Sequence, residues 1–121
     1  MKPILWSPFI LITLLFMPAT AEDSDLMKKK TDHAASILRS LALGDLAKVE
    51  YEAGALARIT RDAGFANRGE HYAEYGEGFL KIVRALEKEA ADRNMAGSYY
   101  EFSRMTGMCF SCHEHMRDDT D

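Results

Sequence analysis

Residues 70–92 read EHYAEYGEGFLKIVRALEKEAAD. Aromatic and aliphatic side chains recur in this stretch at the spacing of helical turns, at Tyr72, Tyr75, Phe79, Ile82, Val83 and Leu86. Residues at this spacing share one face of an α-helix, which predicts an amphipathic helix with one buried face. Such a helix must pack its apolar face against other elements of the protein.

Three further segments, on both sides of this one, show the same pattern. They span about residues 26–43, 45–63 and 96–115, and a turn at 64–69 precedes the helix quoted above. Gly44 is expected to end the first helix, and Asp45 is a favourable N-cap for the second. The residues expected to face inward are Met27, Ala34, Ile37, Leu38 and Leu41 in the first segment, Leu46, Val49, Ala53, Leu56 and Ile59 in the second, and Tyr99, Phe102, Met105, Cys109 and Cys112 in the last.

The four segments together predict an all-α protein. No proline follows Pro18, and the strong helix formers Ala, Leu, Glu, Lys and Arg are abundant. Short connections between helices of this length favour antiparallel neighbours, so the expected fold is an antiparallel up-down-up-down four-helix bundle. In that topology the end of the last helix lies beside the start of the first, and the 64–69 turn lies at the same end.

The N-terminal segment has the features of an export signal. Lys2 is followed by a mostly apolar run over residues 4–17 and by Ala19-Thr20-Ala21, which has the small-x-small form of a cleavage site. The run is shorter than the roughly 20 apolar residues of a membrane-spanning helix, which is the alternative interpretation. We therefore expect residues 1–21 to be a cleaved signal peptide, and residues 22–121 to be one domain in the periplasm without stable membrane insertion.

The charge of the expected mature chain limits its partners. Residues 22–121 carry 14 basic and 19 acidic residues, a net charge of about −5. Nucleic acid would repel such a domain, whereas a protein partner with a basic surface would suit it. No Ser-His-acid set, carboxylate pair or phosphate loop stands out, so the sequence does not predict an enzyme.

The cysteines carry the sharpest motif. Both lie in Cys109-Phe110-Ser111-Cys112, which His113 follows directly, and Cys-x-x-Cys-His is the attachment pattern of c-type haem. Two thiols three residues apart reach the two vinyl groups of the porphyrin, and the next residue directs its imidazole at the iron. Three alternatives are weaker: a zinc site lacks a second Cys pair, a dithiol redox motif lacks its strand-helix-strand setting, and a disulfide would close a very small loop.

An exported helical domain with this motif on its last helix resembles the class II c-type cytochromes, the cytochrome c′ group. The likeness extends over the mature chain in layout, but only Cys109, Cys112 and His113 match a sharp motif. The resemblance implies a four-helix bundle with one covalent haem c near one end, and either electron transfer or binding of small gases such as NO and CO. Class I cytochromes c differ, because their motif lies near the N-terminus and their Met ligand far downstream.

The two functions differ in the sixth ligand of the iron. In the low-spin branch of that family a Met of the first helix is this ligand, and Leu26-Met27-Lys28-Lys29-Lys30 resembles that branch. Met27 is therefore the expected sixth ligand, and simple core packing is the alternative. Less well placed on the sequence are His33, His71, Met95, Met105 and Met108, while His115 is expected to be solvated.

Further residues are expected around the haem and at a dimer contact. Lys30 and Arg68 are expected to pair with the haem propionates and Tyr72 to touch the porphyrin, the alternative being solvated charges and ordinary core. Relatives often pair through their first two helices, which suggests a homodimer through Ile37 and Ala55 or Ile59. Electron transfer is the expected function, gas binding at an open sixth site is the alternative, and a haem-free helical domain is the third hypothesis.

Overall fold

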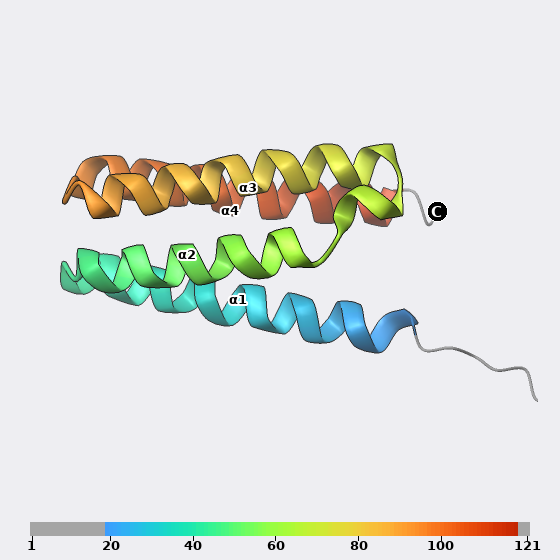
Figure 1. Ribbon diagram of the computed structural model, residues 1–121, viewed down its shortest axis with the longest axis horizontal. Coiled ribbons are helices and arrows are strands. Elements are labelled where there is room, and N and C mark those ends of the chain that lie inside the picture. The colour runs from blue at the N-terminus through green and yellow to red at the C-terminus, as the bar shows by residue number, and fades with distance from the viewer. Residues whose placement is uncertain (1–18, 119–121) are drawn as a thin grey trace, which may run out of the picture.

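The computed structural model describes residues 19–118, and within them the side chains of residues 24–65 and 67–118. These residues form α1 (Ala19–Leu43), α2 (Leu46–Asp62), the short 3₁₀ helix η1 (Phe65–Arg68), α3 (Glu70–Ala91) and α4 (Met95–Asp118), shown in Figure 1. No strand occurs in this part of the chain. The prediction of an all-α protein with four long helices is therefore confirmed, and the expected helix bounds agree closely except at the start of α1.

Helix α1 begins at Ala19, earlier than the expected start near Leu26. The added residues are Ala, Glu and Asp together with Thr and Ser; Ala and Glu are good helix formers, and acidic groups are favourable at a helix N-terminus. Most of the predicted signal peptide, residues 1–18, lies outside the described residues. Among the described helices, none has an apolar stretch long enough to span a bilayer.

Two glycines and one N-cap residue determine the backbone course of the connections before α2 and α3. Gly44 has φ of +72° between α1 and α2, a left-handed conformation that glycine adopts without strain. The Asp45 carboxylate then accepts a hydrogen bond from the backbone N–H of Lys48 at 3.0 Å, which confirms it as the N-cap of α2. Gly69, with φ of +119°, stands directly before α3.

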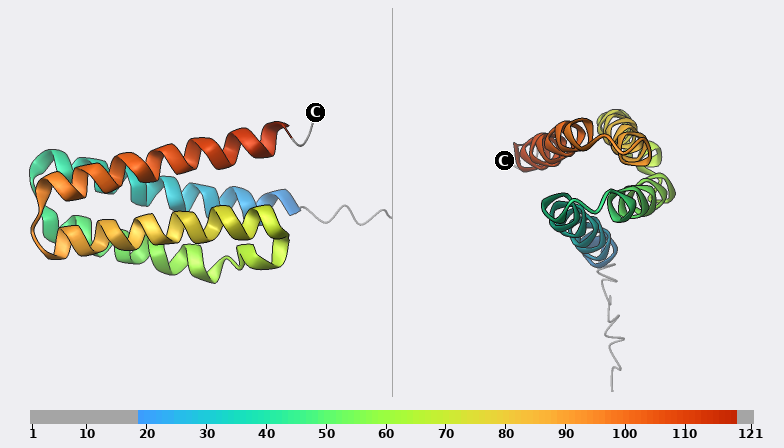
Figure 2. Two further views of the ribbon diagram at one scale, coloured as in Figure 1. Left: turned by 90° about the horizontal axis from the view of Figure 1, so that it is seen from above. Right: turned by 90° about the vertical axis from the view of Figure 1, so that its left-hand side faces the viewer.

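The helices follow one another around an open ring, as the end view in Figure 2 shows. Contacts are extensive between α1 and α2, between α2 and α3, and between α3 and α4, whereas α1 and α4 make far fewer contacts. At one end Met95 of α4 lies beside Gly44: a Cβ added to Gly44 would stand 3.9 Å from the Met95 Cε. At the other end Met27 of α1, Phe65 of η1 and His113 of α4 border one cavity.

The core is built from the expected helix faces, with two exceptions. Its buried apolar residues are Ile37, Val49, Ala53, Leu56, Ala57, Phe79, Ile82, Val83, Leu86, Ala90, Phe102 and Met105. The prediction was wrong for Leu38 and Tyr99, which are 57% and 66% exposed. In α4 the inward position is taken by the small residue Ser98, one residue before Tyr99. The Ser98 hydroxyl donates a hydrogen bond to the Asn94 carbonyl at 2.7 Å. Ile37, expected at a dimer contact, is fully buried within the fold and therefore cannot contact a second copy.

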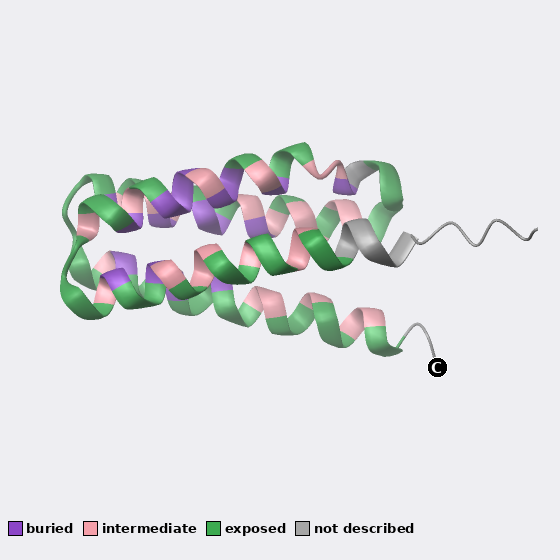
Figure 3. Cartoon of the chain, turned by 90° about the horizontal axis from the view of Figure 1, so that it is seen from below, coloured by how far each residue is buried: buried purple, intermediate pink, exposed green. Residues whose placement is uncertain are grey.

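The core closes only one half of the molecule. Helix α1 has no buried residue within 24–36, and α4 has none within 106–118, although both segments carry apolar side chains. Figure 3 shows the buried positions gathered toward the end of the α1–α2 and α3–α4 connections. The opposite end therefore has apolar helix faces that the protein's own side chains do not seal.

A buried carboxylate joins α1 to α2. Glu52 is 8% exposed, and its two oxygens lie 2.5 Å from Nδ1 of His33 and 3.0 Å from Nζ of Lys48. Burial alone would raise the pKa of Glu52, but the hydrogen bonds from His33 and Lys48 outweigh burial and hold this pKa below its usual value. The charged form of Glu52 is therefore the form that the fold stabilises.

We expect Glu52→Gln to lower the free energy of unfolding by about 1–3 kcal/mol at pH 7, because hydrogen bonds to a charged group are lost. A carboxylate with a lowered pKa contributes fully above its unfolded pKa, about 4.3, and this contribution is lost as pH falls through the folded pKa. Urea unfolding from pH 7 to pH 3 should show the variant and the parent converging in acid. Glu50→Gln is the matched control, since its bond to Arg93 is solvent-exposed and should be worth less than about 0.5 kcal/mol. A loss that stays constant with pH would contradict this assignment.

Candidate functional site

An apolar pocket occupies the unsealed end of the molecule, between α1, α3 and α4. Its empty space is about 680 Å³ when the open solvent at its mouth is included. Its lining is largely apolar and aromatic, with no Asp or Glu: Met27, Lys30, Thr31, Ala34, Phe65, Tyr72, Tyr75, Gly76, Phe79, Met105, Met108, Cys109, Cys112 and His113.

Three residues of the Cys-x-x-Cys-His motif, both cysteines and the histidine, border this pocket. Cys109, Cys112 and His113 are on α4, and helical spacing brings the two cysteines to one face. Both sulfurs are free thiols rather than a disulfide. Phe110 between them is 62% exposed, so the two middle residues point away from the pocket while the three reactive side chains line it.

The pocket keeps the two thiols protonated. Burial raises the pKa of Cys109 and of Cys112, and the nearby Lys30 ammonium opposes this shift in both. A neutral thiol in apolar surroundings is a weak nucleophile, so these cysteines are expected to react slowly with reagents in solvent.

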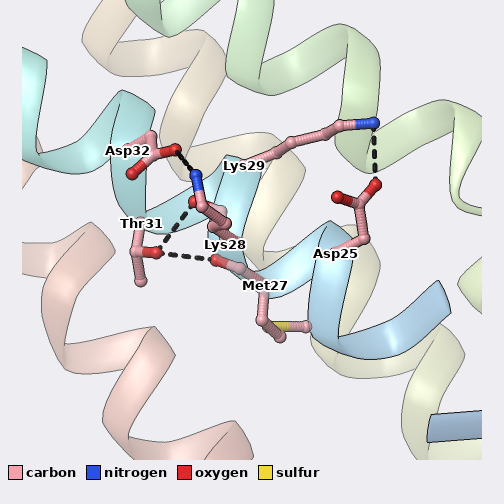
Figure 4. A network of polar contacts seen from close by, with 6 residues as sticks. All are labelled: Asp25, Met27, Lys28, Lys29, Thr31 and Asp32. Carbon is pink, nitrogen blue, oxygen red and sulfur yellow. Dashed lines mark hydrogen bonds and ion pairs between the residues drawn. The ribbon is translucent and has the colours of Figure 1, made fainter. Parts of the chain in front are cut away.

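Met27 lies on the wall opposite the motif. Figure 4 shows its side chain pointing away from the two ion pairs that flank it on α1, Lys28 with Asp32 at 2.9 Å and Lys29 with Asp25 at 3.0 Å. Its carbonyl oxygen accepts the Thr31 hydroxyl at 2.8 Å. Met27 and His113 border one pocket from two helices.

Lys30 points inward rather than into solvent. Its Nζ lies 3.9 Å from the centre of the Phe79 ring and 5.2 Å from that of Phe65, both cation–π contacts within the pocket. Burial lowers the pKa of Lys30, with the two cysteines opposing. Lys30, which was expected in the haem environment from the sequence, therefore lines the pocket.

A second recess adjoins the pocket at the outer end of the helices. It is bordered by Ser24, Met27, Phe65, Arg68, Tyr72, His113 and Met116, so it shares Met27, Phe65, Tyr72 and His113 with the pocket. The Arg68 guanidinium lies 5.5 Å from the centre of the Phe65 ring, near this recess. Of the residues expected to touch a cofactor, Tyr72 and Lys30 thus line the pocket, and Arg68 lines its outer extension.

His33, His71 and Met95 do not line the pocket. His33 is bound to Glu52 between α1 and α2, and Met95 lies at the opposite end of the molecule beside Gly44. The ring centre of His71 is 5.0 Å from that of His115. Met105 and Met108 line the pocket from α4, the helix that carries the motif.

Sequence reasoning missed Phe65, which is 9% exposed and borders both the pocket and the outer recess. It approaches α3 at Gly76, where an added Cβ would stand only 2.8 Å from the Phe65 Cβ. The available signal was an aromatic residue between Gly64 and Gly69, in a turn of otherwise small and polar residues. Such a residue in a turn often covers an apolar site.

Comparison with known proteins adds no relative: the chain matches no family model, no curated protein and no solved structure. Among the described residues, no group of three or more His, Cys, Asp and Glu side chains gathers as ligands for a bare metal ion. The chemistry of the site is therefore argued from the lining of the pocket itself.

Proposed function

We propose that the chain is a monohaem c-type cytochrome that transfers electrons, folded as an antiparallel up-down-up-down four-helix bundle of the cytochrome c′ type. Cys109 and Cys112 would hold one haem c through thioether bonds, and His113 would bind its iron. The observation that carries this proposal is that all three side chains line one apolar pocket at the end of the fold that the core leaves unsealed.

The residues present fit such a group by their chemistry. A porphyrin is a flat, apolar body with a polar edge, and the pocket offers apolar and aromatic walls with the cation Arg68 on its outer recess. The two thiols on its wall are the groups that would form covalent bonds to the porphyrin. Each would add its sulfur and its hydrogen across one vinyl group, a balanced addition that needs no oxidant or reductant.

When bound, haem supplies an iron that takes up and releases one electron. The chain's own residues set the conditions for this exchange. His113 would bind from α4 and Met27 from α1, and the aromatic walls of the pocket would exclude water. A thioether opposite imidazole favours the reduced iron and raises the potential of the couple. We infer that Arg68 pairs with a propionate, because a guanidinium forms strong charge-assisted bonds with carboxylates.

Export follows from the same chemistry. We propose that residues 1–21 are removed during export to the periplasm, where haem is attached to the unfolded chain. The mature chain is acidic, so a redox partner with a basic surface is expected to dock to it, and no catalytic set accompanies the haem site.

Visible spectra of the purified protein, oxidised and reduced, with and without CO, test electron transfer against gas binding. We expect a low-spin spectrum in both states and no change of the reduced spectrum on adding CO, because two protein ligands leave no open position on the iron. A high-spin oxidised spectrum with rapid CO binding by the reduced protein would instead assign gas binding.

A further inference from the structure

Lys30 is the one charged side chain inside an otherwise apolar pocket, and the pocket gives it no counter-charge. Neither an Asp nor a Glu lines the pocket, and no carboxylate among the described residues forms an ion pair with Lys30. Its neighbours Lys28 and Lys29 are each paired with a carboxylate on the outer surface of α1. Ordinary surface lysines resemble these neighbours, so the inward position of Lys30 requires a separate explanation.

The register of α1 places Lys30 on the same side of the pocket as Met27. Three residues of helix correspond to a rise of about 4.5 Å, and side chains at i and i+3 are neighbours on one face. Four methylene groups carry the Lys30 nitrogen farther from the backbone than two carry the Met27 sulfur. The Lys30 amine and the Met27 thioether therefore enter the same pocket from adjacent turns of α1.

We propose that Lys30 is a reserve ligand of the haem iron: its amine binds opposite His113 when the Met27 thioether leaves that position. This inference rests on the proposed function and goes beyond it, since it gives the Met27 side of the haem two ligands on one helix. Nitrogen of a neutral amine binds ferric iron well, whereas a thioether favours ferrous iron, so the exchange would accompany oxidation.

The surroundings of Lys30 favour the neutral amine that this role requires. Burial is the largest influence on its pKa and lowers it, and the opposing influence comes only from Cys109 and Cys112. That opposition needs ionised thiols, and thioether bonds to haem would abolish it. When Lys30 does not bind the iron, its contacts with the rings of Phe79 and Phe65 keep its nitrogen within the pocket.

Three variants of the haem-loaded protein test the proposal: Met27→Ala, Met27→Ala with Lys30→Ala, and Met27→Ala with Lys29→Ala as the matched control. The readout is the oxidised protein at one neutral pH, by electron paramagnetic resonance and by the near-infrared charge-transfer band, whose energy distinguishes sulfur from nitrogen ligands. We expect Met27→Ala and the Lys29 control to remain low-spin with a nitrogen ligand. The variant that lacks Met27 and Lys30 should be high-spin.

Two results would overturn the inference. One is a Met27→Ala protein that is already high-spin, which shows that no reserve ligand is available. The other is a low-spin spectrum that persists without both Met27 and Lys30, which assigns the ligand to another residue such as His33 or His71. Neither result affects the proposed haem attachment, which is measured in the same samples as haem that remains with the polypeptide after denaturation. Loss of that covalent haem from the parent protein would instead defeat the proposed function.

Discussion

Replacing Cys109 and Cys112 together by Ser yields a protein that is colourless after denaturation and extraction, because serine hydroxyls do not add to vinyl groups. Each single variant should retain haem through one thioether or lose it, with a lower yield of coloured protein than the parent. The double variant should also unfold at lower denaturant concentration, since an attached haem is buried in the pocket only in the native state.

Ser111→Ala is the matched control for the cysteine variants. Ser111 lies between the two cysteines on the exposed side of α4, and its hydroxyl donates only to the Gly107 carbonyl at 3.1 Å. The control should attach haem as the parent does. A double cysteine variant that still carries haem resistant to acid–acetone extraction would refute the role of these thiols.

If Met27 is the sixth ligand, as proposed, its replacement by Ala should remove the sulfur ligand and change the electronic state of the iron. The oxidised parent should show a weak far-red band from sulfur-to-iron charge transfer, and the variant should lack this band. Axial ligands set haem potentials over a range of about 0.8 V, so we expect the potential to fall by on the order of 0.1 V. The reduced variant should bind CO readily, because an amine such as Lys30 holds ferrous iron only weakly.

Met95→Ala is the control for this prediction, because Met95 is partly exposed and lies beside Gly44 at the opposite end of the molecule. It should leave the far-red band, the potential and the CO response unchanged. A parent protein without the far-red band that binds CO as fast as the Met27 variant would show that Met27 is not a ligand.

Much of the fold was predictable because local signals agreed with one another. The spacing of apolar residues in 70–92 predicted the extent of α3. Gly44 followed by Asp45 predicted where α2 begins. The start of α1 was placed too late, because a helix that begins in Ala, Glu and Asp residues has no apolar stripe to mark its first turns. Tyr99 was predicted to face inward because it is more hydrophobic than its neighbour Ser98. In the structure the inward position belongs to Ser98, which is fully buried, and Tyr99 is exposed.

The site was predictable where the motif is local and not where it depends on packing. Cys109, Cys112 and His113 follow from five consecutive residues, and Met27 follows from the ends that the topology brings together. Phe65 could not be assigned, because its burial depends on the close approach to Gly76 across two elements. Lys30 was expected near the site from the sequence, but its contacts with Phe79 and Phe65 were not, because they depend on the packing of α1 against α3 and η1.

The most direct test of the central claim is the mass of the purified, exported protein after acid–acetone extraction, measured beside its visible spectrum. The proposal predicts a coloured polypeptide whose mass equals residues 22–121 plus one haem, with the added mass on the peptide that contains Cys109 and Cys112. A colourless polypeptide with the mass of the amino-acid chain alone, from cells that attach haem to other exported cytochromes, would contradict it.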